Sequence, residues 1–196
     1  MMKKMSLRRN ITVALLSAIA YLIMYLQFPL PLIPVFLQID LSDIPALIAA
    51  IMYGPLAGVV VEAVKNIIHA FVMGSVIGEA ANFFAGSLFI VVSTYIYHKG
   101  KTLRSLIIGM GAGTLVMAGV MSVANYFIIF PLYAYFLGFS IEQAVQLAKA
   151  ANHSIHDLIS LIVLAILPFN IIKGIIISIL ALPIYARLRP RLRTDA

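Results

Sequence analysis

Six predominantly apolar stretches alternate with short polar or turn-forming segments along the chain. A helix that crosses the hydrocarbon core of a bilayer needs about 20 mostly apolar residues, so stretches of this kind predict membrane spans. We predict an all-α fold, a single polytopic membrane domain over residues 1–196 in which six transmembrane helices form one bundle. The spans are expected at about 11–28, 44–53, 56–72, 79–98, 103–136 and 157–186.

The segment between the first two spans is unusually apolar for a loop. It contains Pro29, Pro31 and Pro34, which cannot continue a helix, and it carries Asp40 and Asp43 but no lysine or arginine. We interpret it as a loop on the outer side that folds back over another part of the protein. Asp43 or Ser42 is expected to cap the helix that follows, with Pro45 in its first turn.

The composition supports the membrane assignment. The chain is 63% hydrophobic and 11% charged, whereas soluble domains carry about 25% charged residues. Because the sequence contains no cysteine, disulfides, thiol nucleophiles and cysteine-ligated metal sites are excluded.

The net charge of +7 arises from basic clusters that predict topology rather than nucleic-acid binding. Cytoplasmic loops of membrane proteins carry an excess of lysine and arginine. An even number of predicted spans separates each cluster from the next, so the N- and C-termini are both expected on the cytoplasmic side of the cell membrane. The clusters are Lys3, Lys4, Arg8 and Arg9; Lys99, Lys101 and Arg104; and Arg187, Arg189, Arg191 and Arg193.

The most informative polar residues lie deep in the last span. A cation at the depth of Lys173 costs about 2.5–3.5 kcal/mol on insertion scales, so it is expected to face a polar cavity or a partner. Asn170 lies one helical turn earlier, and Pro168 removes a backbone donor beside it. The alternatives are that Lys173 snorkels to an interface or neutralises a buried carboxylate such as Glu79.

The predicted 56–72 span also carries polar residues. Glu62 and Lys65 are spaced so that they can pair, and Asn66 and His69 follow along roughly the same side. A structural polar stripe and a ligand site are both compatible with this pattern. A zinc site is not predicted, because no second histidine or carboxylate stands at a suitable spacing.

This topology places the first, third and fifth loops on the outer face. Polar residues at the outer ends of the 79–98 and 103–136 spans, and along the 157–186 span, converge toward those loops. We therefore predict an outward-facing, mostly apolar pocket that is covered by the first loop.

Taken together, several motifs resemble the substrate-binding S components of energy-coupling factor (ECF) vitamin transporters, most closely the riboflavin-specific ones. The resemblance covers nearly the whole chain in the expected order. The motifs that carry it are Ala14-x-x-x-Ala18, Asp40-Leu41-Ser42-Asp43-Ile44-Pro45, Tyr53-Gly54-Pro55, Gly78-Glu79-Ala80-Ala81-Asn82-Phe83, Asn125-Tyr126 and Asn170-x-x-Lys173.

The resemblance implies a subunit with no ATPase activity and no cofactor of its own. It also implies that the chain functions together with a transmembrane coupling subunit, which docks at Ala14 and Ala18, and with two ATP-binding cassette (ABC) ATPases. Riboflavin is implied as the transported ligand. The residues that the resemblance assigns to ligand contacts are Asn125, Asn170 and Lys173 through side chains, and Leu37, Leu41, Ala85 and Gly86 mainly through the backbone.

The residues themselves are compatible with a flavin. Lys173 and the two asparagines supply donors and acceptors for the polar edge of an isoalloxazine ring, and abundant aromatic and aliphatic residues can cover its faces. No arginine cluster lies on the outer side, which argues against the phosphorylated flavin FMN as the main substrate. Other vitamins, such as pantothenate or thiamine, remain the main alternative. A small membrane enzyme is disfavoured because no Ser-His-Asp, HExxH or paired-carboxylate pattern is found.

Overall fold

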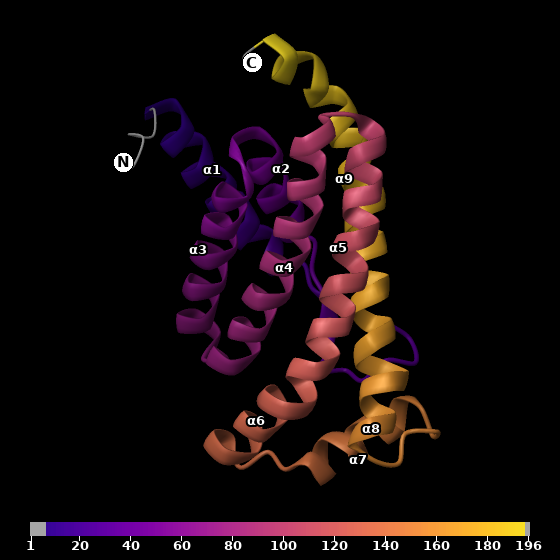
Figure 1. Ribbon diagram of the computed structural model, residues 1–196. Coiled ribbons are helices and arrows are strands. Elements are labelled where there is room, and N and C mark those ends of the chain that lie inside the picture. The colour runs from indigo at the N-terminus through magenta and orange to yellow at the C-terminus, as the bar shows by residue number, and fades with distance from the viewer. Residues whose placement is uncertain (1–6, 195–196) are drawn as a thin grey trace.

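The computed structural model describes residues 7–194, with side chains up to residue 188. Five long helices form most of the bundle, together with a shorter one, α2 (Figure 1). Five helical stretches are long and apolar enough to cross a membrane, and α2 is an apolar helix below that length. The all-α prediction is therefore confirmed. The six helices are α1 (Leu7–Met24), α2 (Asp43–Tyr53), α3 (Pro55–Met73), α4 (Val76–Gly100), α5 (Leu103–Ala124) and α9 (Leu167–Thr194).

The first connection folds back along the bundle. Helix α1 ends at Met24, earlier than the 11–28 span predicts, because Phe28–Pro29 (β1) pairs antiparallel with Gln38–Ile39 (β2). Ile33 and Ile39 of this connection are buried against Phe169 of α9. The apolar loop is thus part of the core rather than a solvated linker.

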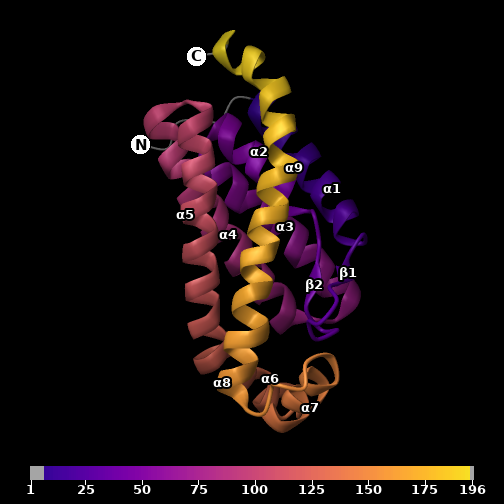
Figure 2. The ribbon, with the colours of Figure 1, turned by 90° about the vertical axis from the view of Figure 1, so that its right-hand side faces the viewer.

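The two ends of the bundle are formed by different elements. Helix α1 begins, α4 turns into α5, and α9 ends at the same end of the molecule (Figures 1 and 2). At the opposite end lie α6 (Phe130–Leu137), α7 (Ile141–Ala151) and α8 (Leu158–Leu161). Asp157 caps α8 by accepting hydrogen bonds from the backbone and the hydroxyl of Ser160 at 2.7 and 2.6 Å, and these bonds lower the pKa of Asp157.

Two single turns of π-helix interrupt the long helices near that second end. The turn η1 (Asn125–Ile129) joins α5 to α6, and η2 (Ile162–Ile166) joins α8 to α9. The two turns contact each other. Such turns add a residue to the helix, redirect side chains and occur frequently at functional sites.

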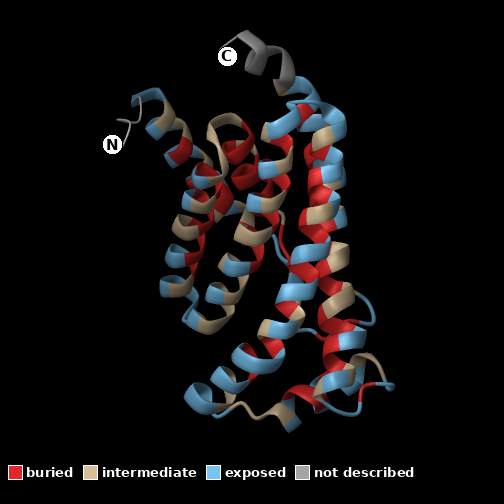
Figure 3. Cartoon of the chain, in the orientation of Figure 1, coloured by how far each residue is buried: buried red, intermediate tan, exposed pale blue. Residues whose placement is uncertain are grey.

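The remaining core lies between α1, α2, α3, α4, α5 and α9. Figure 3 shows buried residues facing inward and exposed residues on the outer faces. Helices α4 and α5 approach closely at Gly109 and Gly113, where a Cβ would lie 2.3 Å from the carbonyl oxygen of Ser93 and 2.7 Å from that of Phe89. Close backbone approach of this kind is the usual way in which membrane helices pack.

Candidate ligand-binding site

A cavity of about 680 Å³ lies in the half of the bundle that contains α6 and the π turns. Its wall is mostly apolar and comes from α1, the 25–42 connection, α3, α4, α5, η1, α6, α7, η2 and α9. This size and composition are typical of small-molecule sites, which combine apolar walls with a few placed polar groups. The polar residues in the wall are Gln27, Gln38, Asp40, His69, Ser75, Glu79, Asn82, Asn125, Asn170 and Lys173.

The structure brings together most of the predicted site residues but not all of them. Leu37, Ala85, Asn125, Asn170 and Lys173 line the cavity, and Leu41 and Gly86 do not. Leu41 instead packs against two hydrophobic clusters of the core. Gly86 faces α3, where a Cβ would lie 2.6 Å from Oε2 of Glu62. These last two residues lie behind the cavity wall.

Asn125 and Asn170 share one arrangement on facing helices. Each side-chain Nδ2 donates a 2.8 Å hydrogen bond to the carbonyl oxygen one turn earlier, of Met121 and Ile166 respectively. Both side chains are largely buried. Within the described part of the chain neither Oδ1 has a hydrogen-bond donor, so each can accept a bond from a molecule in the cavity.

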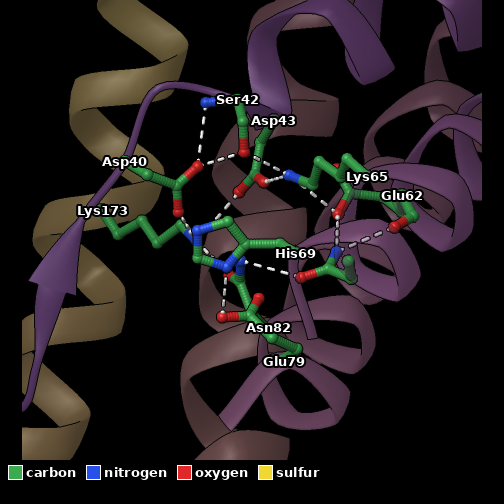
Figure 4. A network of polar contacts seen from close by, with 10 residues as sticks. Asp40, Ser42, Asp43, Glu62, Lys65, His69, Glu79, Asn82 and Lys173 are labelled. Atoms are coloured by element: carbon green, nitrogen blue, oxygen red, sulfur yellow. Dashed lines mark hydrogen bonds and ion pairs between the residues drawn. The ribbon is translucent and has the colours of Figure 1, made fainter. Parts of the chain in front are cut away.

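Lys173 contacts carboxylates at the inner end of the cavity (Figure 4). Its Nζ lies 2.7 Å from Oδ1 of Asn82, 3.2 Å from Oδ2 of Asp43 and 3.4 Å from Oδ2 of Asp40. Only 3% of the residue is exposed, so the snorkelling alternative is wrong. Lys173 does neutralise buried carboxylates, but the partner suggested from the sequence, Glu79, is wrong because it pairs with His69.

Asp43 does not act as a helix cap. Ser42 occupies the N-cap position without a side-chain capping bond, and Asp43 is the first residue of α2. The Asp43 carboxylate is fully buried and contacts both Lys65 and Lys173. The sequence contained part of the signal for this pairing, because two lysines deep in apolar spans require buried carboxylates, and Asp40 and Asp43 stand in an apolar segment without lysine or arginine.

The polar residues of α3 complete a buried charge network, which consists of Asp40, Ser42, Asp43, Glu62, Lys65 and Lys173. Lys65 contacts Glu62 at 3.0 Å, which confirms the pairing predicted from their spacing, and it donates to the Ser42 hydroxyl at 2.6 Å. The Ser42 hydroxyl in turn donates to Asp40. The network therefore holds three carboxylates and two ammonium groups, and it ties the first connection to α3 and α9.

Two asparagines link the charge network back to the cavity. Asn66 Nδ2 donates to Glu62 Oε2 at 3.2 Å, and Asn82 Nδ2 donates to Asn66 Oδ1 at 3.1 Å. Asn82 then accepts from Lys173. The polar stripe on α3 is therefore structural in part and reaches the cavity through Asn82.

His69 and Glu79 form a second polar feature of the wall. His69 Nδ1 lies 2.8 Å from Glu79 Oε1, and the imidazole contacts the rings of Tyr21 and Tyr25 edge to face. Among the described residues, no group of three histidine, aspartate or glutamate side chains is placed to hold a metal ion.

Ala14 and Ala18 lie outside the cavity, on the exposed face of α1. The opposite face of this helix, with Val13, Ser17 and Ala20, is buried in the bundle. The small-residue pair therefore does not serve the internal packing of the chain.

Comparison with known proteins gives consistent matches over nearly the whole length. Residues 4–185 match the family model of the ECF transporter substrate-specific component. Similar proteins include riboflavin transporter RibU of Staphylococcus aureus (strain TCH60), 40% identical, and riboflavin transporter FmnP of Bacillus subtilis (strain 168), 39% identical. Each alignment covers 95% of this chain and 94% of the relative. A solved structure described as the S component of a bacterial ECF transporter matches with a TM-score of 0.76 at 39% identity, covering 94% of this chain and 97% of that one.

Proposed function

The chain belongs to the family of ECF transporter substrate-specific components, and from this membership we propose that it captures riboflavin outside the cell membrane for ATP-driven uptake. The observation that carries the choice of ligand is the cavity, where Asn125, Asn170 and Lys173 meet in an otherwise apolar wall. Near full-length similarity to two riboflavin transporters supports the same ligand. Because the family consists of transport components, the chain is not an enzyme.

The cavity offers complementary groups for each part of an isoalloxazine ring. Phe130, Phe169 and Leu37 can cover its apolar faces. The free amide oxygens of Asn125 and Asn170 can accept a hydrogen bond from the ring N–H, and Lys173 can donate to a ring carbonyl. Ala85 has too small a side chain to obstruct the ring. In this arrangement Leu41 and Gly86 support the wall from behind instead of touching the ligand.

Pantothenate fits the cavity less well, because it carries a carboxylate and the cavity's cation, Lys173, is already held by Asp40 and Asp43. Competition of pantothenate or thiamine with riboflavin for the isolated chain tests the choice of ligand.

The proposed partners are the transmembrane coupling subunit and two ABC ATPases of an ECF module. The exposed small-residue pair Ala14 and Ala18 on α1 supports a close helix–helix contact with the coupling subunit. Exposed apolar side chains beside the pair, at Leu15 and Ile19, suit either lipid or such a partner.

The proposed orientation places both termini in the cytoplasm and the cavity end outside. The basic residues whose side chains the structure describes at the end where α1 begins, α4 turns into α5 and α9 ends support this assignment; they are Arg8, Arg9, Lys99, Lys101, Arg104 and Arg187. The other members of the predicted clusters, Lys3, Lys4, Arg189, Arg191 and Arg193, lie outside the part of the chain whose side chains are described.

We expect cysteines at the two ends to be labelled from opposite sides of the membrane. The chain has no native cysteine, so Lys99→Cys and Ser154→Cys each introduce a single exposed thiol. A membrane-impermeant maleimide should label Ser154→Cys in intact cells and Lys99→Cys only after permeabilisation. Labelling of both variants in intact cells, or the reverse order, would contradict the orientation.

A further inference from the structure

Glu79, which is partly buried, differs from the buried acids of this region in its partner. Asp40, Asp43 and Glu62 each contact at least one lysine. Within the described part of the chain, the ion-pair partner of Glu79 is His69 alone, at 2.8 Å. Among the described residues no lysine or arginine contacts the Glu79 carboxylate, and its Oε2 is buried without a hydrogen-bond partner.

The cavity has no spare cation to offset that charge. Lys173 is the one lysine or arginine in its described wall, and its ammonium group already contacts Asp40, Asp43 and Asn82. A ligand with a negative group would have to displace a carboxylate from Lys173 or remain uncompensated. Like charges brought together in a partly desolvated site repel strongly.

Glu79 lies on the path between the inner end of the cavity and its outer part. It precedes Asn82, the partner of Lys173, by three residues on α4, which is about 4.5 Å of helical rise toward the outer end. A flavin whose ring edge meets Lys173, Asn125 and Asn170 must extend its side chain along this outer part of the wall. That side chain is a hydroxylated ribityl group in riboflavin, and it ends in a phosphate in FMN.

We propose that Glu79, held in position by His69, is a specificity residue that admits the uncharged hydroxylated tail of the flavin and rejects its phosphate ester. This inference rests on the proposed function. A ribityl hydroxyl can donate a hydrogen bond to the carboxylate. A phosphate monoester carries a charge of about −1.5 to −2 at neutral pH and would be repelled.

The test compares riboflavin and riboflavin 5′-phosphate in equilibrium titrations of the purified full chain. In Glu79→Gln, which removes the charge but retains an amide of similar shape, the ratio of the Kd for the phosphate to the Kd for riboflavin should fall about tenfold or more. Glu79→Asp keeps the charge and should keep most of the ratio. Glu142→Gln is the matched control, since Glu142 is an exposed carboxylate on α7 outside this cavity.

The outcomes for the Glu79 variants test the role of Glu79, and the result for the unmodified chain tests the proposed function. An unchanged ratio in Glu79→Gln, with riboflavin still bound, would overturn the role of Glu79. An equal loss of affinity for both flavins would also overturn it, because Glu79 would then be a general binding or folding residue; melting temperatures separate these two cases. Failure of the unmodified chain to bind riboflavin would instead contradict the proposed function.

Discussion

A tryptophan in place of Ala14 or Ala18 is expected to abolish riboflavin uptake while riboflavin binding by the isolated chain remains intact. Both alanines lie on the exposed face of α1, away from the cavity. Small residues at this spacing allow another helix to approach closely, and an indole side chain would hold the coupling subunit away. Uptake should be measured in cells, and affinity by titration of the purified variants.

The control for this prediction is Leu115→Trp, which places the same ring at an exposed apolar position on α5. Uptake should survive in that variant. If Ala14→Trp or Ala18→Trp loses binding together with uptake, the pair would be needed for the chain's own fold and would not be a docking surface.

The second large effect is expected for Lys173→Met. This change keeps much of the side-chain volume but removes three donors. If Lys173 donates to a flavin carbonyl, riboflavin affinity should fall by about 1.5–3 kcal/mol, which is roughly tenfold to a hundredfold. The free energy of unfolding without ligand should also fall, by about 3–5 kcal/mol, because Asp40 and Asp43 lose a buried partner.

Lys65→Met separates the ligand role from the structural role. Lys65 is fully buried in the same charge network and holds Asp43 and Glu62, but it does not line the cavity. Its substitution should lower the melting temperature of the empty protein as strongly as Lys173→Met does, with a much smaller change in affinity. Equal losses of affinity in the two variants would mean that Lys173 acts only through the network, and unchanged affinity in Lys173→Met would remove it from the ligand site.

The local features of the fold and site could be read from the sequence. The pairing of Glu62 with Lys65 follows from helical spacing, and the burial of Asn170 and Lys173 follows from their depth in an apolar span. The folding back of the first connection follows from its prolines and its apolar side chains. Each of these depends on residues that are close together in the chain.

The features that the sequence did not predict depend on distant contacts. Ser42-Asp43 before a helix matches a capping pattern. The Asp43 carboxylate instead contacts Lys65 and Lys173, which lie 22 and 130 residues further along the chain. The two π turns leave no periodic signal in apolar stretches, although Asn125 begins one of them and Asn170 lies one turn after the other. Gly86 faces Glu62 and not the cavity, which requires knowledge of how α4 is rotated against α3.

We expect this chain alone to bind riboflavin in the cavity that α4, α5 and α9 help to form. The decisive experiment is a titration of the purified full chain into riboflavin, with flavin fluorescence as the signal. We expect saturable quenching with one flavin per chain, unaffected by an excess of pantothenate or thiamine. Absence of saturable quenching, together with measurable binding of one of those other vitamins, would show that riboflavin is not the ligand of this chain.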